Sequence, residues 1–336
     1  MSDATHLLVG NPTAQSGANA ARIDRAVKWL AGAGIACDVL PTLPGGKTIG
    51  AVADALRAHP YGCVISMGGD GTFREVASGL IDSGRAEHVA MGMLPTGTAN
   101  DQGRSFGLDA GDAALEPNLA VVAKGNETRL DAGKMLVPGR APAWFFDSAG
   151  WGISARVLRA RNEDRALVET HAPLLKTFYR DQLVYAGALL RVFLDSFVVD
   201  DTFSATVEAD GRQVVLEGLT DLVIKGTRVY GGAWVFDRES RHDDGRFEVV
   251  PFRGKLDWTS KAIVDLDGNP VTEEMLNTIG VEHSHPFSAA RMTIRFAWRH
   301  DGPAPAAQID GEEYEASAEA TIEVVPRVIR LVVPED

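Results

Sequence analysis

The sequence has little cysteine, no excess of positive charge and no long apolar run. Its two cysteines, Cys37 and Cys63, lie in apolar, strand-like segments, so we expect reduced core residues, as in a cytoplasmic protein. With 33 Lys and Arg against 46 Asp and Glu, the net charge is −13, which argues against general binding to nucleic acid or to acidic membranes.

The sequence also shows no apolar segment of the kind that spans a membrane or directs secretion. No apolar stretch approaches the roughly 20 residues that cross a bilayer, and the longest, residues 186–199, is interrupted by Arg191 and Asp195. The first residues lack the basic start and apolar run of a signal peptide. We therefore expect a cytoplasmic location.

The most informative stretch is a glycine-rich turn, Gly-Gly-Asp-Gly-Thr, at residues 68–72. It follows an apolar run over 61–67 that is typical of a buried strand, and apolar residues within 73–80 then recur at the spacing of one helix face. Glycines allow close approach of a ligand, and the free N–H groups at a helix start attract phosphate. Asp70 would repel a bare phosphate, so it is best placed beside a cation such as Mg²⁺. The alternative is a tight turn with a helix-capping Asp.

The first hundred residues repeat a pattern of strand, polar loop and helix. We expect strands at 6–10, 35–40, 61–67 and 89–94. This repeat predicts a doubly wound parallel sheet, in which ligands bind beyond the carboxyl ends of the strands. Polar loops follow all four strands at that edge, at 11–17, 41–42, 68–72 and 95–101.

After about residue 131 the pattern changes to short strands separated by Asp-Gly turns. We expect strands at 202–209, 214–216, 222–224, 246–250, 292–296 and 320–325, and a helix over roughly 176–197. The fold prediction is an α/β doubly wound domain over 1–130 and a β-sandwich domain over 131–336, whose last strands can return to the first domain. The segment 262–281 reads as an insertion without an assigned role.

Several motifs together resemble the diacylglycerol kinase catalytic-domain family, in particular its soluble bacterial lipid-kinase branch, to which sphingosine kinases are similar. They are Asn11-Pro12, the turn at 68–72, Pro-Thr-Gly-Thr-Ala-Asn-Asp at 95–101 and Asp-Gly-Glu at 310–312. The glycine-rich turn alone is also similar to NAD kinases and phosphofructokinases. The motif at 95–101 is much more specific to lipid kinases, and the later Asp-Gly-Glu strengthens the match.

The resemblance implies an ATP-dependent kinase with Mg²⁺ as cofactor. The residues expected to lie against ATP are Asn11, Pro12, Thr13, Thr42, Gly68, Gly69, Asp70, Gly71, Thr72, Phe73, Arg74 and Thr98. Asp70 would also organise Mg²⁺ and the phosphates, and Glu312, assisted by Asp310, would accept the proton of the attacking hydroxyl. The acceptor would contact Asn100, Asp101 and Arg104.

Relatives also hold a second, structural Mg²⁺ near an Asp-Asp-Gly turn. Here it would use Asp244 and the backbone carbonyls of Arg241 and Arg246, since an Asp beside free carbonyls suits a hard cation. The alternative is a plain β-turn. Because Glu312 lies far along the sequence from residues 68–72, we expect the second domain to fold back over the nucleotide.

Two positions depart from the resembled family. Asp147 stands where relatives commonly carry Asn, and Gln102-Gly103 stands where they commonly carry Phe-Ala, on the expected acceptor side of the cleft. The acceptor therefore stays open among lipids of diacylglycerol, phosphatidylglycerol or sphingoid type. We expect transient contact with a membrane surface and no nucleic-acid partner, and a homodimer is open. The alternatives are an NAD-kinase-like or small-alcohol kinase, and a catalytically silent nucleotide-binding regulator.

Overall fold

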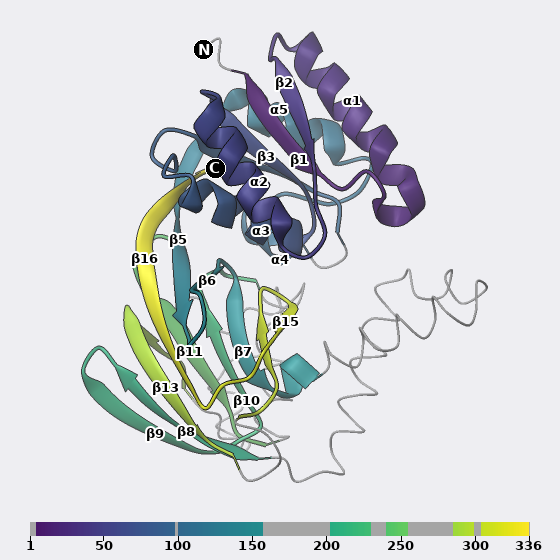
Figure 1. Ribbon diagram of the computed structural model, residues 1–336. Helices are drawn as coiled ribbons and strands as arrows, with labels where there is room; N and C mark the ends of the chain where they lie inside the picture. Colours follow the sequence, from purple (N-terminus) through teal and green to yellow (C-terminus); the bar gives the residue numbers. More distant parts are fainter. Residues whose placement is uncertain are drawn as a thin grey trace, which may run out of the picture.

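The computed structural model describes residues 5–97, 100–156, 202–229, 240–254, 285–298 and 304–335. Figure 1 shows an α/β unit at one end, two packed β-sheets at the other, and two strands, β5 and β16, that run from one into the other. No helix in these ranges is long and apolar enough to cross a membrane. The expected helix at 176–197 and the insertion at 262–281 lie outside the described residues.

The α/β unit is built as the strand–helix repeat predicts. Its elements are β1 (His6–Gly10), η1 (Ala14–Gly17), α1 (Ala18–Gly32), β2 (Cys37–Pro41), α2 (Lys47–Ala58), β3 (Cys63–Gly68), α3 (Asp70–Asp82), β4 (Ala90–Pro95), α4 (Asp101–Ser105) and α5 (Leu115–Lys124). The strands pair in parallel in the order β2-β1-β3-β4. The doubly wound parallel sheet is therefore confirmed.

Helices cover both faces of this sheet because each has one apolar face. On one side, Val76 and Leu80 of α3 join Leu56 of α2 in a core with β1, β3 and β4. On the other side, Leu30 of α1 and Leu119 of α5 pack against the opposite faces of the same strands. The sheet is thus buried on both sides, as parallel sheets require, and its carboxyl edge is left to the loops.

The second unit is a β-sandwich. Its strands are β5 (Glu127–Leu136), β6 (Ala143–Phe145), β7 (Ser148–Gly152), β8 (Phe203–Ala209), β9 (Arg212–Leu219), β10 (Asp221–Lys225), β11 (Phe247–Phe252), β12 (Phe287–Ala289), β13 (Arg291–Ala297), β14 (Ala307–Ile309), β15 (Glu312–Tyr314) and β16 (Glu319–Val332). One sheet has the order β12-β11-β10-β7-β14-β15. Its inward residues, such as Trp151 and Ile224, share a core with Val207 and Ile294 of the facing sheet, which confirms the sandwich.

The two units share one sheet through β16. Its first part pairs antiparallel with β13, and near its end Leu331 pairs in parallel with Met91 of β4. Strand β5 pairs with β16 on both sides of an irregularity between Val325 and Ile329. The last strand therefore returns to the α/β unit. The expected boundary at 130/131 falls inside β5, so the division into two domains stays a prediction.

Candidate active site

The glycine-rich turn joins β3 to α3, as expected. A Cβ on Gly68 would collide with the side chain of Thr72, and a Cβ on Gly97 would lie 2.5 Å from the Cα of Gly69. The turn after β3 and the loop after β4 therefore touch backbone to backbone, which only glycine allows. The amide of Thr96 also donates to the Gly68 carbonyl at 2.8 Å, so the two loops form one surface.

The loops after β1 and β2 meet at the same edge. The side-chain oxygen of Asn11 accepts the backbone N–H of Thr13 at 3.0 Å and its hydroxyl at 2.8 Å, which fixes the turn around Pro12. The amide of Thr42 donates to the carbonyl of Gly10 at 3.0 Å. All four polar loops thus gather at the carboxyl edge of the sheet, although Thr98 lies outside the described residues.

Asp70, the first residue of α3, contacts the start of α4. Its carboxylate accepts the backbone N–H of Gln102 at 3.2 Å, so it docks the start of α4 onto α3. Burial raises the pKa of Asp70, and backbone N–H groups of residues 100–102 oppose that rise. The Asp70 carboxylate thus bonds an N–H group at the start of α4, and not one of α3, the helix that the capping alternative concerned. A contact between Asp70 and a cation stays a prediction.

The residues expected at the acceptor lie on and before α4. Asn100 has a left-handed backbone (φ 53°), and its side-chain amide both accepts the N–H of Gly97 (2.9 Å) and donates to the carbonyl of that residue (2.7 Å). Asp101 is buried, whereas Arg104 is exposed. The structure therefore gives Asn100 a role in holding Gly97, and the acceptor contacts stay predictions.

Asp310 lies buried behind the site. Its carboxylate accepts the backbone N–H groups of Phe146, Asp147 and Ser148 at 2.8–3.1 Å. Burial raises the pKa of Asp310 to about 6, against the charge of Arg74 and these three hydrogen bonds. Because these three N–H groups belong to the β6–β7 junction, Asp310 acts here as a positioning group.

Glu312 reaches the glycine-rich turn from β15. Its carboxylate forms an ion pair with the guanidinium of Arg74 on α3, and a Cβ on Gly71 would overlap it. The Glu312 side chain keeps 53% of its surface exposed, whereas that of Arg74 keeps 19%. The second unit therefore folds back over the first turn of α3, as the separation of the two motifs predicted, and it leaves one accessible carboxylate there.

Sequence reasoning missed the network around Asp147. This residue is buried, and its carboxyl accepts hydrogen bonds from the hydroxyls of Thr227 and Ser148. Burial raises its pKa well above the ordinary range, and the charges of Asp101, Asp310 and Asp70 raise it further. The sequence marked Asp147 only as a departure, and Thr227 gave no signal because its role depends on a contact between residues 80 positions apart.

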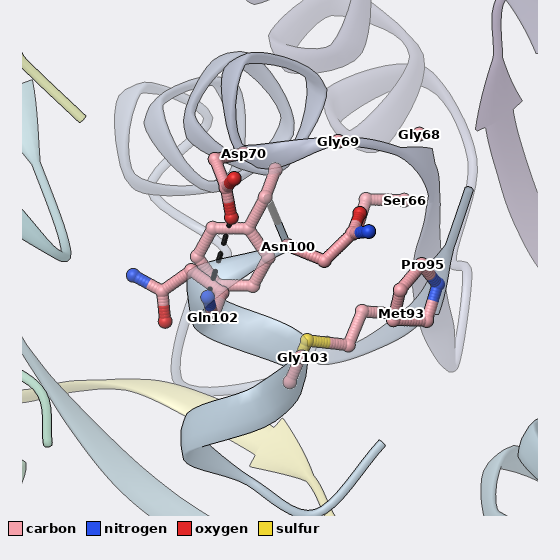
Figure 2. A pocket seen from close by; sticks show the side chains of 10 residues that line it. Ser66, Gly68, Gly69, Asp70, Met93, Pro95, Asn100, Gln102 and Gly103 are labelled. Carbon is pink, nitrogen blue, oxygen red and sulfur yellow. Dashed lines mark hydrogen bonds between the residues drawn. The ribbon is translucent and has the colours of Figure 1, made fainter. Parts of the chain in front are cut away.

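A small pocket lies between the turn after β3 and α4 (Figure 2). It is lined by Ser66, Gly68, Gly69, Asp70, Phe73, Met93, Pro95, Asn100, Gln102 and Gly103. Its volume of about 10 Å³ is close to what one water molecule needs, so it is not itself a nucleotide pocket. In the described part of the chain, no three His, Cys, Asp or Glu side chains converge as a metal site.

The turn expected to hold a second cation lies beside β5. The Asp244 carboxylate accepts the N–H of Arg246 at 3.0 Å, and Arg241 pairs with Asp243 at 3.2 Å. Asp131 of β5 anchors this turn by accepting the N–H of Gly245 at 2.6 Å. The turn is therefore held firmly, with oxygen donors at its surface, and a metal at Asp244 stays a prediction.

Comparisons with known proteins agree with this geometry. The model of the diacylglycerol kinase catalytic domain family matches residues 5–135. A protein named probable lipid kinase YegS-like from Klebsiella pneumoniae is 36% identical over 141 residues, which cover 42% of this chain and 44% of that protein. One of the same name from Pseudomonas aeruginosa is 32% identical over 200 residues, 59% of this chain and 56% of that protein. The matches thus span about half the length of these relatives.

The solved structures extend the likeness to the whole fold. A crystal structure of a diacylglycerol kinase from Bacillus anthracis superposes with a TM-score of 0.66 at 17% identity, covering 98% of this chain and 97% of that one. At this identity the likeness establishes the shared fold, with a parallel α/β unit followed by an antiparallel β-rich unit. The match to the diacylglycerol kinase catalytic-domain family is confined to residues 5–135, whereas the likeness in fold extends over nearly the whole chain.

Proposed function

We propose that the protein is a kinase that transfers the γ-phosphoryl group of ATP to a hydroxyl of a lipid. The observation that carries this proposal is the position of Glu312. It brings an exposed carboxylate from the second unit onto the first turn of α3, next to the loops where a phosphate chain would bind. The family and the lipid-kinase names of the relatives support the same reaction class.

The nucleotide would bind at the carboxyl edge of the parallel sheet. The start of α3 offers backbone N–H groups, and its helix dipole favours phosphate there. Arg74, one turn into α3, supplies a positive charge beside these groups. Phosphoryl transfer depends on this kind of positioning and charge neutralisation more than on covalent help.

Glu312 is the candidate general base. The acceptor hydroxyl gives its proton to the Glu312 carboxylate as its oxygen attacks the γ-phosphorus, and ADP leaves with the electrons of the broken P–O bond. Such proton transfer is typically worth about 10²- to 10⁴-fold in rate. Asp310 supports the step from behind, because it fixes the β6–β7 junction next to the Asp-Gly-Glu turn.

Two cation sites belong to the proposal. One Mg²⁺ would accompany ATP near Asp70 and would neutralise the charge that develops on the phosphates. A second would be held by Asp244 with the carbonyls of Arg241 and Arg246, all oxygen donors of the kind that Mg²⁺ prefers. Because a lipid acceptor resides in a bilayer, the protein would contact the membrane surface transiently during each turnover.

Turnover assays on purified protein test the proposal. ATP consumption with Mg²⁺ would be measured with diacylglycerol, phosphatidylglycerol, sphingosine, NAD and small polyols, with Glu312→Ala as the control. Lipid-dependent turnover that the variant lacks supports the proposal. Turnover only with NAD or a polyol would instead identify a small-alcohol kinase, and ATP binding without turnover on any acceptor would indicate a regulator.

A further inference from the structure

The carboxylate of Glu312 lies where the proposed function places a phosphate. A Cβ on Gly71 would overlap a carboxylate oxygen of Glu312 and would lie 3.3 Å from its carboxylate carbon. Gly71 is the second residue of α3, and the residue before the helix, Gly69, has no side chain that could cap it. Because N–H groups at a helix start attract anions, this carboxylate takes the place of an anionic ligand.

The same carboxylate binds the cation of the site. It accepts a hydrogen bond from the terminal Nη2 of Arg74, whose side chain keeps 19% of its surface exposed, against 53% for Glu312. Burial raises the pKa of Asp310, and the charge of Arg74 opposes that rise, so the guanidinium acts on both carboxylates. Asp310 is buried, whereas Glu312 is exposed. Of the two carboxylates, Glu312 is therefore the one that an incoming phosphate can displace.

The hairpin between β14 and β15 holds the backbone of Glu312. Asp310 and Gly311 form its two-residue turn, and both have a left-handed backbone (φ 46° and 74°). The N–H of Gly311 donates to the side-chain oxygen of Gln308 at 2.9 Å, which fixes the turn from the side. Departure from the ion pair is therefore a rotation of one half-exposed side chain, and the hairpin itself stays in place.

The ion pair and the proposed chemistry make opposite demands on Glu312. A carboxylate that accepts a hydrogen bond from a guanidinium has fewer lone pairs left for the proton of an acceptor hydroxyl. The phosphate chain of ATP carries more negative charge than one carboxylate, and phosphate is a strong partner of arginine. A phosphate that takes over Arg74 would therefore release the carboxylate that the reaction needs.

We propose that Glu312 is an internal competitor of the nucleotide: its carboxylate holds Arg74 until the phosphate chain of ATP displaces it, and the displacement frees it as the general base. The base then becomes available after ATP has bound, so proton transfer from the acceptor follows nucleotide binding. This regulation rests on the proposed function, which places ATP at the start of α3 and the acceptor hydroxyl at Glu312.

Ligand binding measures this competition without any acceptor. Calorimetry would give the Kd of AMPPNP with Mg²⁺, and of inorganic tripolyphosphate, for the wild type, Glu312→Gln, Glu312→Asp and the control Glu313→Gln. The Gln variant removes the charge. The Asp variant keeps the charge but is one methylene shorter, so it ends short of the guanidinium. Glu313, the next residue of β15, projects to the opposite face of the strand.

We expect both Glu312 variants to bind the two ligands about 3- to 30-fold more tightly than the wild type, because no ion pair has to be broken first. This range lies between the value of an exposed ion pair and that of a hydrogen bond to a charged group. Glu313→Gln should bind like the wild type. Tighter binding combined with slower turnover in Glu312→Gln is the result that a side chain with a purely structural role would not give.

A double-mutant cycle connects the effect to Arg74. In the Arg74→Gln background, Glu312→Gln should change the Kd less than twofold, because the partner of the carboxylate is already gone. An equal gain in both backgrounds would indicate general repulsion between the carboxylate and the phosphates, and would overturn the proposal. If Arg74→Gln does not fold, Glu312→Asp makes the same distinction, since repulsion alone would leave its Kd at the wild-type value.

Failure of this proposal can be told apart from failure of the proposed function. If the wild type binds both ligands and neither Glu312 variant binds them more tightly, the carboxylate does not compete with phosphate, and the proposed function stands without this regulation. If the wild type binds neither AMPPNP nor tripolyphosphate, the proposed function itself fails, and the competition fails with it.

Discussion

The guanidinium of Arg74, on the first helical turn after the glycine-rich loop, forms an ion pair with the carboxylate of Glu312 on β15. The two residues lie 238 positions apart in the sequence. Their contact is one of the places where the β-sandwich meets the loops of the parallel sheet. The same guanidinium opposes the rise in the pKa of Asp310, so one cation serves both carboxylates of the Asp-Gly-Glu motif.

Replacing Glu312 with Gln should abolish proton acceptance and preserve the fold. We expect kcat to fall by about 10²- to 10⁴-fold, the usual contribution of a general base. Thermal unfolding should change little, because the side chain is about half exposed. Glu313→Gln is the matched control, since the adjacent residue of β15 projects to the opposite face of the strand. Near-normal turnover in Glu312→Gln would contradict the role of this carboxylate.

The raised pKa of Asp310 predicts a pH-dependent stability. The folded-state pKa of about 6 exceeds the ordinary 3.8, so the folded protein binds more protons than the unfolded chain between these values. The contribution of this group is fully present below pH 3.8 and is lost as pH rises to about 6. At about 1.4 kcal/mol per pKa unit, the loss amounts to about 3 kcal/mol in the free energy of unfolding.

Asp310→Asn isolates this effect, because the variant has no group to titrate. The difference in unfolding free energy between wild type and variant should shrink by about 3 kcal/mol from pH 4 to pH 7, as measured by urea denaturation. Loss of the Asp310 charge also lowers the pKa of Asp147, which acts in the same direction. A difference that is constant with pH would show that the carboxyl of Asp310 titrates normally.

Helices α2 and α3 pack too closely for a side chain at Gly79. A Cβ there would lie 2.7 Å from the backbone oxygen of Ile49 and 2.8 Å from the Cβ of Val52. Gly79→Ala should therefore lower the free energy of unfolding by about 1–3 kcal/mol through overpacking. Gly50→Ala, on the exposed side of α2 with nothing within 4 Å, should instead raise it by about 0.5–1 kcal/mol. Equal effects of the two substitutions in urea denaturation would refute the close packing.

Binding of Mg²⁺ at the 241–246 turn should stabilise the folded protein without nucleotide. We expect millimolar Mg²⁺ to raise the Tm of the wild type over that in EDTA, because a ligand of the folded state shifts unfolding by mass action. Asp244→Asn should lose this increase, whereas Asp54→Asn, on the exposed side of α2, should keep it. The same increase in all three proteins would place the cation elsewhere.

The sequence predicted the elements whose apolar spacing is regular. Strand β3 and helix α3 follow from their periodic patterns, as do the loops that gather at the carboxyl edge. Strand β7 was not predicted, because Ser-Ala-Gly-Trp-Gly is rich in glycine and resembles a loop until its neighbours β10 and β14 are known. Strand β2 begins at Cys37, two residues later than expected.

In the site, too, neighbouring residues in the sequence predict some features, whereas others depend on tertiary contacts. The glycines at 68–72 are enough on their own to predict a tight turn. The burial of Gln102 and the hydrogen bonds around Asp147 depend instead on contacts between segments far apart in the chain, and no local pattern encodes them. The hydrogen-bond partner of Asp70 could not be predicted for the same reason, since a carboxylate can bind a cation or an N–H group at a helix start.

The return of β16 to the parallel sheet has a consequence for biosynthesis. The core of the α/β unit includes Ile329 and Leu331, which leave the ribosome long after the strands that they cover. Until then, the nascent chain carries β4 with an open edge, which is a template for pairing with other chains. The α/β unit therefore completes its folding only after the β-sandwich has been translated, although its own sequence comes first.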